Sequence, residues 1–301
     1  MQNASIIVVG SSNTDMVIKT PRLPAPGETI LGGSFFMNAG GKGANQAVAA
    51  ARLGGNITFI ARVGDDIFGR QAIQLFKDEG INTSCIITDA ENPSGVALIM
   101  VDDNGENCIA VAGGANAALL PADMETMQDI IAEADIILMQ LETPVATIDY
   151  VAALAKRYSK KIILNPAPAC ILDDGLLANI TIITPNQTEA EILTGVTVTD
   201  ETSALAAAVV LHKKGIDQVI ITLGADGALV YSDNKYKMVI PPKVVAVDTT
   251  AAGDVFNGAL AVGLGEGMDI FDAADFACKA AAISVTRLGA QASAPARHEI
   301  L

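Results

Sequence analysis

Residues 247–260 read VDTTAAGDVFNGAL and place one carboxylate, Asp254, at the predicted start of an apolar helix. The apolar run 244–247 predicts a strand leading into this stretch, and residues 251–253 have almost no side chain. Small residues let backbone N–H groups approach a ligand, and a helix N-terminus adds partial positive charge. Asp254 is therefore a candidate general base beside a seat for negative charge. An N-cap aspartate without any ligand explains the pattern about as well.

Short apolar runs recur along the chain and are typical of strands buried on both faces of a parallel sheet. They are residues 6–9, 57–60, 136–139, 162–164, 180–183 and 219–223. Ala- and Leu-rich stretches lie between them at 44–55, 143–158 and 202–216, with helix start and stop signals. This alternation predicts an α/β fold whose mostly parallel central sheet is flanked by helices.

Two segments interrupt the alternation. Residues 14–38 contain three prolines and no helical period. Residues 94–112 hold two apolar runs around Asp103-Asn104-Gly105, which is a hairpin signal. We expect these segments to form a small β-sheet lid over a cleft, attached to a single α/β domain that spans residues 1–301.

Composition and charge exclude several classes of function. The chain has 301 residues, half of them apolar, and a formal net charge of −15. This charge disfavours nucleic acid and anionic membranes as partners, although backbone N–H groups can still bind a small phosphate ligand. Four separated cysteines and two histidines predict no zinc cluster, and we expect buried thiols in a reducing compartment. We find no signal peptide or membrane span and expect a cytoplasmic protein.

Polar residues follow other predicted turns and strands. NAGGKGANQAVAA (38–50) fits neither GxxxxGK[ST] nor GxGxxG, but its glycine turn, Lys42 and an amide suit a polyol. Asn13 and Asp15, two apart in extended chain, point the same way and can bind neighbouring hydroxyls. Glu142 ends a predicted strand, where parallel sheets bind ligands. A bare glycine turn and an Asx turn are the alternatives for the first two patterns.

Two later segments are compatible with nucleotide binding. Asn186 and Glu189 form either a capping box or an amide and a carboxylate facing phosphates and the water shell of magnesium. TLGADG (222–227) is either a turn between two strands or a backbone edge for a phosphate or ribose.

In this order the features resemble the signature set of the ribokinase family of sugar kinases, the phosphofructokinase-B type, from Ser5 to Pro295. GGKGANQAVAAARLG is similar to the first signature of the family and DTTAAGDVFNGAL to the second. MQLE, LNPAPA, TPNQTEAE and VTRLGAQAS also match in order. The resemblance implies a three-layer fold with a β lid and ATP-dependent phosphorylation of D-ribose at the 5-hydroxyl.

The resemblance also implies roles for individual residues. Asp254 would be the general base, with Ala251, Ala252 and Gly253 as the anion hole. The sugar would be held by Asn13, Asp15, Gly41, Lys42, Asn45, Glu142 and Asp254. ATP, with Mg²⁺, would meet Asn186, Glu189, Thr222, Leu223, Gly224, Ala225, Asp226, Gly227, Gly253 and Cys278. An activating monovalent cation, usually K⁺, would lie at Asp248, Thr250, Ser284, Arg287, Gly289 and Ser293. The lid would also pair two subunits in a homodimer.

Some positions depart from the family pattern, and other functions stay open. Cys278 stands where Asn or His is common beside the adenine, and Ala292 replaces a proline in the cation loop. The same chemistry on deoxyribose, fructose or a nucleoside is the nearest alternative. A non-catalytic sugar or nucleotide sensor is another, although the presence of Asp254, Gly253 and Lys42 argues against it. A dinucleotide-dependent oxidoreductase is disfavoured because no GxGxxG follows the first strand.

Overall fold

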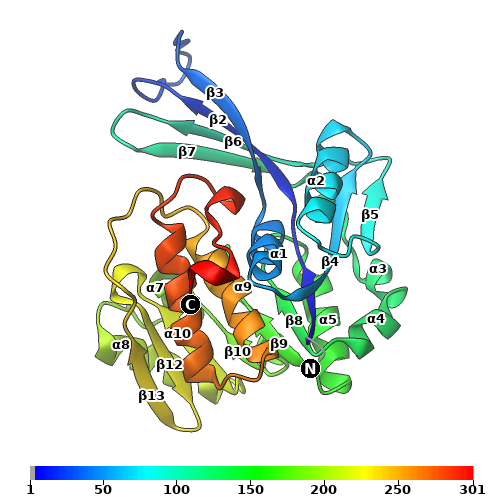
Figure 1. Ribbon diagram of the computed structural model, residues 1–301, viewed down its shortest axis with the longest axis vertical. Helices are drawn as coiled ribbons and strands as arrows, with labels where there is room; N and C mark the ends of the chain where they lie inside the picture. The colour runs from blue at the N-terminus through cyan, green and yellow to red at the C-terminus, as the bar shows by residue number, and fades with distance from the viewer. Residues whose placement is uncertain (1–3, 301) are drawn as a thin grey trace.

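The structure is a computed structural model that describes residues 4–300, whose strands form one large and one small sheet (Figure 1). The large sheet has nine strands in the order β13-β12-β11-β10-β9-β8-β1-β4-β5. They are β1 (Ser5–Val9), β4 (Asn56–Gly64), β5 (Ile86–Asp89), β8 (Ile136–Met139), β9 (Lys161–Leu164), β10 (Ile182–Ile183), β11 (Gln218–Thr222), β12 (Ala228–Ser232) and β13 (Lys235–Val239). Neighbours from β5 to β11 pair in parallel, and β12 and β13 add antiparallel pairs at one edge.

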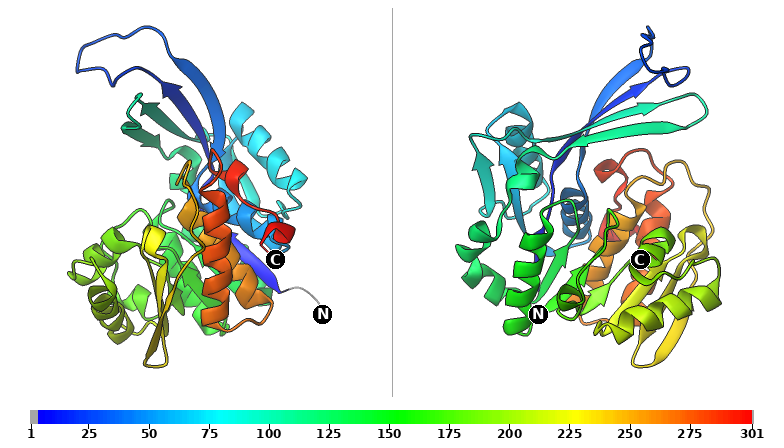
Figure 2. Two further views of the ribbon diagram at one scale, coloured as in Figure 1. Left: turned by 60° about the vertical axis from the view of Figure 1, so that its left-hand side comes forward. Right: turned by 180° about the vertical axis from the view of Figure 1, so that it is seen from behind.

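Helices cover both faces of this sheet (Figures 1 and 2). One face carries α1 (Lys42–Arg52), α2 (Ile67–Asp78), α9 (Ala252–Gly265) and α10 (Ile270–Ser284). The other carries α3 (Pro121–Glu125), α4 (Gln128–Glu133), α5 (Val145–Arg157), α6 (Asp174–Leu177), α7 (Gln187–Thr194) and α8 (Glu201–Lys213). Short 3₁₀ helices are η1 (Gly114–Ala118), η2 (Gly224–Asp226), η3 (Gln291–Ser293) and η4 (Arg297–Glu299).

Alternation along β1 shows how the sequence produces these layers. Ile6 and Val8 belong to the apolar cluster under α1 and α9, whereas Ile7 and Val9 belong to the cluster on the opposite face. Successive side chains of a strand point to opposite faces, so a strand with a continuous apolar run packs against a core on each face of the sheet. The predicted α/β fold with a mostly parallel sheet is confirmed. No helix within residues 4–300 is both long and apolar enough to span a membrane.

The small sheet projects from one end of the body (Figures 1 and 2). Its order is β3-β2-β6-β7, formed by β2 (Asn13–Lys19), β3 (Ser34–Gly40), β6 (Gly95–Val101) and β7 (Asn107–Ala112). The two segments expected to form a lid supply these strands, except that β2 begins at Asn13 and β3 continues to Gly40. Gly105, at φ 83°, lies in the β6–β7 turn, as the hairpin signal predicted. Because β2 starts four residues after β1 ends, the base of the lid lies at the carboxyl edge of the large sheet.

Two expectations from the sequence are wrong. Residues 244–247 form no strand but an exposed loop, in which Val245 is 85% exposed. The backbone N–H groups of Val247 and Asp248 donate to Val285 O just beyond α10, at 2.7 and 3.1 Å, so a helix end takes the place of a neighbouring strand. The thiols are also not all buried, because Cys108 is exposed on β7 and Cys170 is half-buried.

Candidate active site

A cleft of about 190 Å³ lies at the carboxyl edge of the parallel strands, beside the N-terminus of α9. Parallel α/β sheets bind ligands at this edge. The cleft is lined by Lys42, Asn165, Ala167, Thr184, Asn186, Glu189, Thr222, Thr249, Ala251, Ala252, Gly253, Asp254 and Asn257. The predicted base, the predicted anion hole and three further predicted nucleotide contacts therefore share one cleft.

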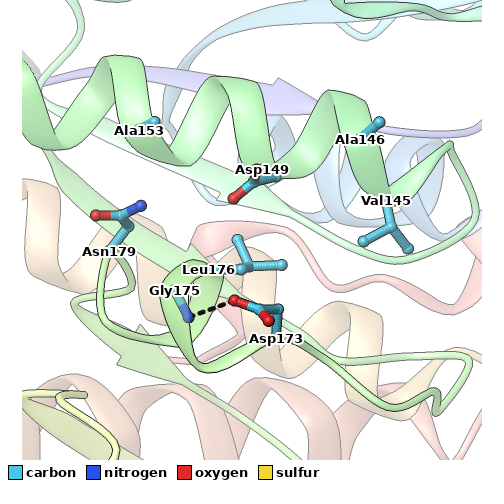
Figure 3. A pocket seen from close by; sticks show the side chains of 8 residues that line it. All are labelled: Val145, Ala146, Asp149, Ala153, Asp173, Gly175, Leu176 and Asn179. Carbon is cyan, nitrogen blue, oxygen red and sulfur yellow. Dashed lines mark hydrogen bonds between the residues drawn. The ribbon is translucent and has the colours of Figure 1, made fainter.

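A larger groove of about 460 Å³ lies elsewhere, between α5 and α6 (Figure 3). Apolar Val145 and Leu176 line it together with the carboxylates of Asp149 and Asp173. Asp173 caps α6 by accepting a hydrogen bond from Gly175 N at 2.7 Å. None of the residues predicted for the site lines this groove, so its size does not make it the site of the chemistry.

Asp254 lies in the first turn of α9 and is only 5% exposed. Both carboxylate oxygens accept hydrogen bonds from amides: Asn45 Nδ2 donates to Oδ2 and Gln46 Nε2 donates to Oδ1, each at 2.9 Å. Burial raises the pKa of Asp254, while the charge of Lys42 and these two donors act against that rise. A buried carboxylate held in one orientation, with increased proton affinity, suits a general base.

The backbone before Asp254 makes an unusual turn. Ala251, the N-cap of α9, adopts the left-handed conformation with φ 59° and ψ 13°, which costs energy for a residue with a Cβ. Among residues 4–300, the N–H groups of Gly253 and Asp254 have no hydrogen-bond acceptor. A Cβ added to Gly253 would meet nothing within 4 Å. Two unpaired N–H groups at a helix N-terminus, beside open space, form a seat for an anion.

The predicted sugar residues gather next to this seat. Glu142 Oε2 accepts hydrogen bonds from Ser11 Oγ at 2.6 Å and from Lys42 N at 2.9 Å. Burial, and then the nearby charges of Glu142 and Asp254, raise the pKa of Asp15 to about 6. The structure therefore brings carboxylates from three distant segments together at the base of the lid.

Asn13 and Gly41 complete the sugar set with close backbone contacts. Asn13 Oδ1 accepts a hydrogen bond from Asn116 Nδ2 at 2.8 Å. Gly41 has φ 89°, and a Cβ there would lie 2.8 Å from Asn13 N, so only glycine fits. Asn45 Oδ1 is buried and has no hydrogen-bond partner within residues 4–300. An unpaired buried acceptor is costly unless a ligand group satisfies it.

On the nucleotide side, the capping box at Asn186 and Glu189 is present. Glu189 N donates to Asn186 Oδ1 and Asn186 N donates to Glu189 Oε2, each at 2.8 Å. Burial is the main cause that raises the pKa of Glu189. Since both side chains also line the cleft, the cap does not exclude nucleotide contact. Their contact with a nucleotide stays a prediction.

The stretch 222–227 is the predicted turn between two strands, here β11 and β12, with η2 inside it. Of its residues only Thr222 lines the cleft. Gly227 has φ 93°, and a Cβ there would lie 2.0 Å from Val239 O. Cys278 is buried in α10, outside the cleft lining, and burial raises its pKa to about 12. An inert thiol fits that position better than a reactive one.

The predicted cation residues lie on two segments that Asp248 joins. Its carboxylate accepts hydrogen bonds from Thr250 N at 2.9 Å and from Gly289 N at 2.8 Å. Burial acts to raise the pKa of Asp248, but these hydrogen bonds outweigh it and lower the pKa. Ser284 and Ser293 are buried, and their hydroxyls donate to backbone carbonyls of Ala281 and Ala290. Arg287 instead forms an ion pair with Glu299.

Several polar residues of the site were not singled out from the sequence. Gln140, Asn165 and Thr184 directly follow strands β8, β9 and β10, at the edge where Glu142 was found. Asn257 donates to Gly253 O at 2.8 Å and accepts from Thr184 Oγ1 at 2.7 Å, so it supports the anion seat. Gln46 contacts Asp254 directly. The position of a polar residue after a buried strand was the available signal.

A buried carboxylate beside an anion seat, in a cleft next to a lid, is an arrangement suited to moving a phosphoryl group onto a hydroxyl of a small molecule. The chain belongs to the pfkB family of carbohydrate kinases, whose sequence pattern matches residues 3–297.

Individual members of the family are similar over almost the whole chain. Ribokinase of Haemophilus influenzae is 48% identical over 297 residues, covering 99% of this chain and 97% of that protein. Deoxyribokinase of Salmonella typhimurium is 38% identical over 291 residues, covering 96% and 95%. The structure of Arabidopsis thaliana ribokinase complexed with ribose and ATP is 33% identical and superimposes with a TM-score of 0.94 over 100% of this chain and 98% of that one. The predicted ribokinase-like three-layer fold is thereby confirmed.

Proposed function

We propose that this protein is a ribokinase, transferring the γ-phosphoryl group of ATP to the 5-hydroxyl of D-ribose. The observation that carries the proposal is the pairing of Asp254, buried and held by two amides, with the open anion seat at Gly253. A sensor that only binds sugar has no need for a base beside an anion seat. The extensive identity to ribokinases supports the same conclusion.

In this mechanism Asp254 accepts the proton of the attacking hydroxyl as the new O–P bond forms, and the bond from phosphorus to the leaving ADP oxygen breaks. The N–H groups of Gly253 and Asp254 stabilise the negative charge on the transferring group. Asn13, Asp15, Gly41, Lys42 and Glu142 would hold the sugar. Asn45 would donate to Asp254 while its unpaired Oδ1 accepts from a sugar hydroxyl.

The residues present fit both proposed cations. Glu189 is a buried carboxylate in the cleft beside the Asn186 amide, which suits the water shell of Mg²⁺. Bound Mg²⁺ would neutralise phosphate charge. The Asp248 carboxylate joins segments 248–250 and 284–293 by accepting from Thr250 N and Gly289 N. Together with backbone carbonyls of these segments it would hold K⁺, since carboxylate and carbonyl oxygens suit hard cations. Removing K⁺ should then lower turnover by loosening the loop before α9.

The direct test is release of ADP from MgATP and D-ribose, in potassium salt and again in choline salt. We expect ribose-dependent ADP that falls sharply in choline. A protein that binds ATP but releases no ADP with ribose, 2-deoxyribose, fructose or nucleosides would instead be a sensor.

The sugar is the finer part of the proposal, because a deoxyribokinase is also similar to this chain. A site built to hydrogen-bond a hydroxyl rejects the analogue that lacks it. We therefore expect kcat/KM for D-ribose to exceed that for 2-deoxyribose by at least about 10-fold. A preference for 2-deoxyribose would move the substrate and leave the mechanism intact.

We also propose that the lid pairs two copies of the chain. Phe35, Leu98 and Val111 are 60%, 55% and 59% exposed on its strands, and such apolar surface marks a contact site. Leu98→Glu and Val111→Glu test the two faces, since strand register places only Val111 on the face of Asp15. Sedimentation should show a wild-type dimer, with a monomer for the variant on the paired face. Monomeric wild type would refute the pairing.

A cytoplasmic location completes the proposal. An exposed free thiol such as Cys108 persists best in a reducing compartment, and ATP is the phosphoryl donor there. One α/β domain spanning residues 1–301, with a lid at 14–38 and 94–112, is the domain organisation that we propose.

A further inference from the structure

A chain of buried amides connects Asp254 to the ends of two core strands. Gln46 Nε2 donates to Asp254 Oδ1 at 2.9 Å and to Asn165 Oδ1 at 3.0 Å. Gln46 Oε1 accepts from Gln140 Nε2 at 2.7 Å. Gln140 directly follows β8 and Asn165 directly follows β9, and Gln46 and Gln140 have no exposed surface.

The carboxylate fixes the direction of every hydrogen bond in this chain. An ionised Asp254 has no proton to donate, so Gln46 must present its NH₂ group to it. Gln46 then turns its carbonyl oxygen to Gln140, which must present its own NH₂ group. The opposite orientation of Gln46 would set its oxygen against the carboxylate and would leave the oxygens of Gln46 and Asn165 facing each other.

The network is retained at an energetic cost. Gln140 Oε1 is buried and has no partner within residues 4–300. The Gln140 side chain also requires glycine at position 10, because a Cβ on Gly10 would lie 2.1 Å from Gln140 Oε1. A buried unpaired acceptor of this kind is destabilising, and an apolar residue that merely fills space at position 140 would avoid that loss.

We propose that Gln46, itself oriented by Gln140, is a positioning residue that holds the Asp254 carboxylate in the orientation needed to take the sugar proton. This inference rests on the proposed kinase function and deepens it. Gln46 touches neither the sugar nor the nucleotide in this role. It acts only through Asp254, on the side of the carboxylate opposite to the donor from Asn45.

The same hydrogen bond favours the ionised base. Its loss should raise the pKa of Asp254 further, because a donor stabilises the charged form. The other charged groups facing Asp254 are Lys42 on α1, Glu142 after β8, Asp15 on β2 and Glu189 on α7. These groups are unchanged by replacement of Gln46, so a shift between wild type and variant reports the amide.

The test compares Gln46→Met, similar in length without the amide, with wild type. We expect kcat at pH 7 to fall about 10-fold to 100-fold, with KM for ribose changed by less than about 3-fold. The acid limb of kcat/KM should move up by about 1 pH unit, so that part of the activity returns at high pH. Gln140→Met should act in the same direction, more weakly. Thr147→Val is the control for a general loss of stability. It removes a buried hydroxyl of α5 that donates a hydrogen bond to Leu119 O.

A second readout does not need turnover. The carboxyl ¹³C resonance of Asp254, assigned by its disappearance in Asp254→Asn, should titrate at higher pH in Gln46→Met than in wild type. Wild type that does not phosphorylate ribose would refute the proposed function, while this titration would still test the role of Gln46. A folded Gln46→Met protein with kcat within about 2-fold of wild type and an unmoved titration would overturn the inference. If Gln46→Met does not fold, the two readouts on Gln140→Met decide in the same way.

Discussion

The two sides of helix α9 near its start have opposite surroundings. On the cleft side, a Cβ added to Gly253 would meet nothing within 4 Å. On the side packed against α1, a Cβ added to Gly258 would lie 2.7 Å from Gln46 O and 2.9 Å from the Ala49 Cβ. The first glycine leaves room for a ligand, and the second lets two helices approach closely enough for Gln46 to reach Asp254. Identical residues five positions apart thus lie in opposite surroundings, one beside open space and one packed against a neighbouring helix.

On the cleft side of α9, the largest loss of turnover is expected from a substitution at Asp254. Asp254→Asn should fold and bind both ligands but lose at least about 100-fold in turnover, because the amide cannot accept the proton. Steady-state kinetics with ligand-binding titrations will measure it. Asp200→Asn, the same change at the N-cap of α8, is the matched control and should keep wild-type turnover. Near-normal turnover in Asp254→Asn would remove the base assignment.

Gly253→Ala tests the open side of the helix. We expect turnover to fall by at least about 10-fold, because the added methyl group occupies the space of the transferring group. Stability should stay within about 1 kcal/mol of wild type, on the stabilising side, since Ala favours helix. Denaturant unfolding and kinetics measure both. A destabilised variant with full activity would reverse the interpretation of this position.

Gly258→Ala tests the packed side. The new Cβ has no room between the helices, so we expect a loss of about 1–3 kcal/mol in unfolding free energy despite the better helix propensity of Ala. Urea unfolding measures it, with Gly253→Ala as the control within the same helix. Unchanged stability would mean that α1 and α9 separate at little cost.

Asp15→Asn tests the charge at the base of the lid, and its expected effect on stability is the smallest of the four. The native pKa of Asp15 is about 6 against an ordinary 3.8, so the native state holds this proton more tightly than the unfolded chain. Wild type should therefore lose stability from Asp15 as pH rises from about 4 to about 6. The variant should melt higher than wild type above pH 6, and the difference should shrink toward pH 4. Asp149→Asn, at an exposed position, is the control. Equal melting of wild type and Asp15→Asn at every pH would contradict the raised pKa of Asp15.

Local patterns were sufficient for most of the architecture. Continuous apolar runs marked the buried strands, the hairpin signal at 103–105 marked the lid, and small residues marked the start of α9. The strand predicted at 244–247 is absent because a strand needs a neighbouring strand. Here the backbone N–H groups of Val247 and Asp248 bond instead to Val285 O at the end of α10. The small-residue run 251–253 singled out Gly253, but no local pattern showed that Gly258 packs against α1.

The sequence by itself determined the α/β layering, the lid segments and the position of Asp254 at a helix N-terminus, because period, turn chemistry and helix signals act over a few residues. Only the tertiary structure decided which groups surround that carboxylate. Gln46 is 208 residues from Asp254 along the chain and 94 from Gln140, yet all three share one buried network. Contacts at such separations follow from how α1, α9 and the strand ends pack together, and no local pattern carries that information.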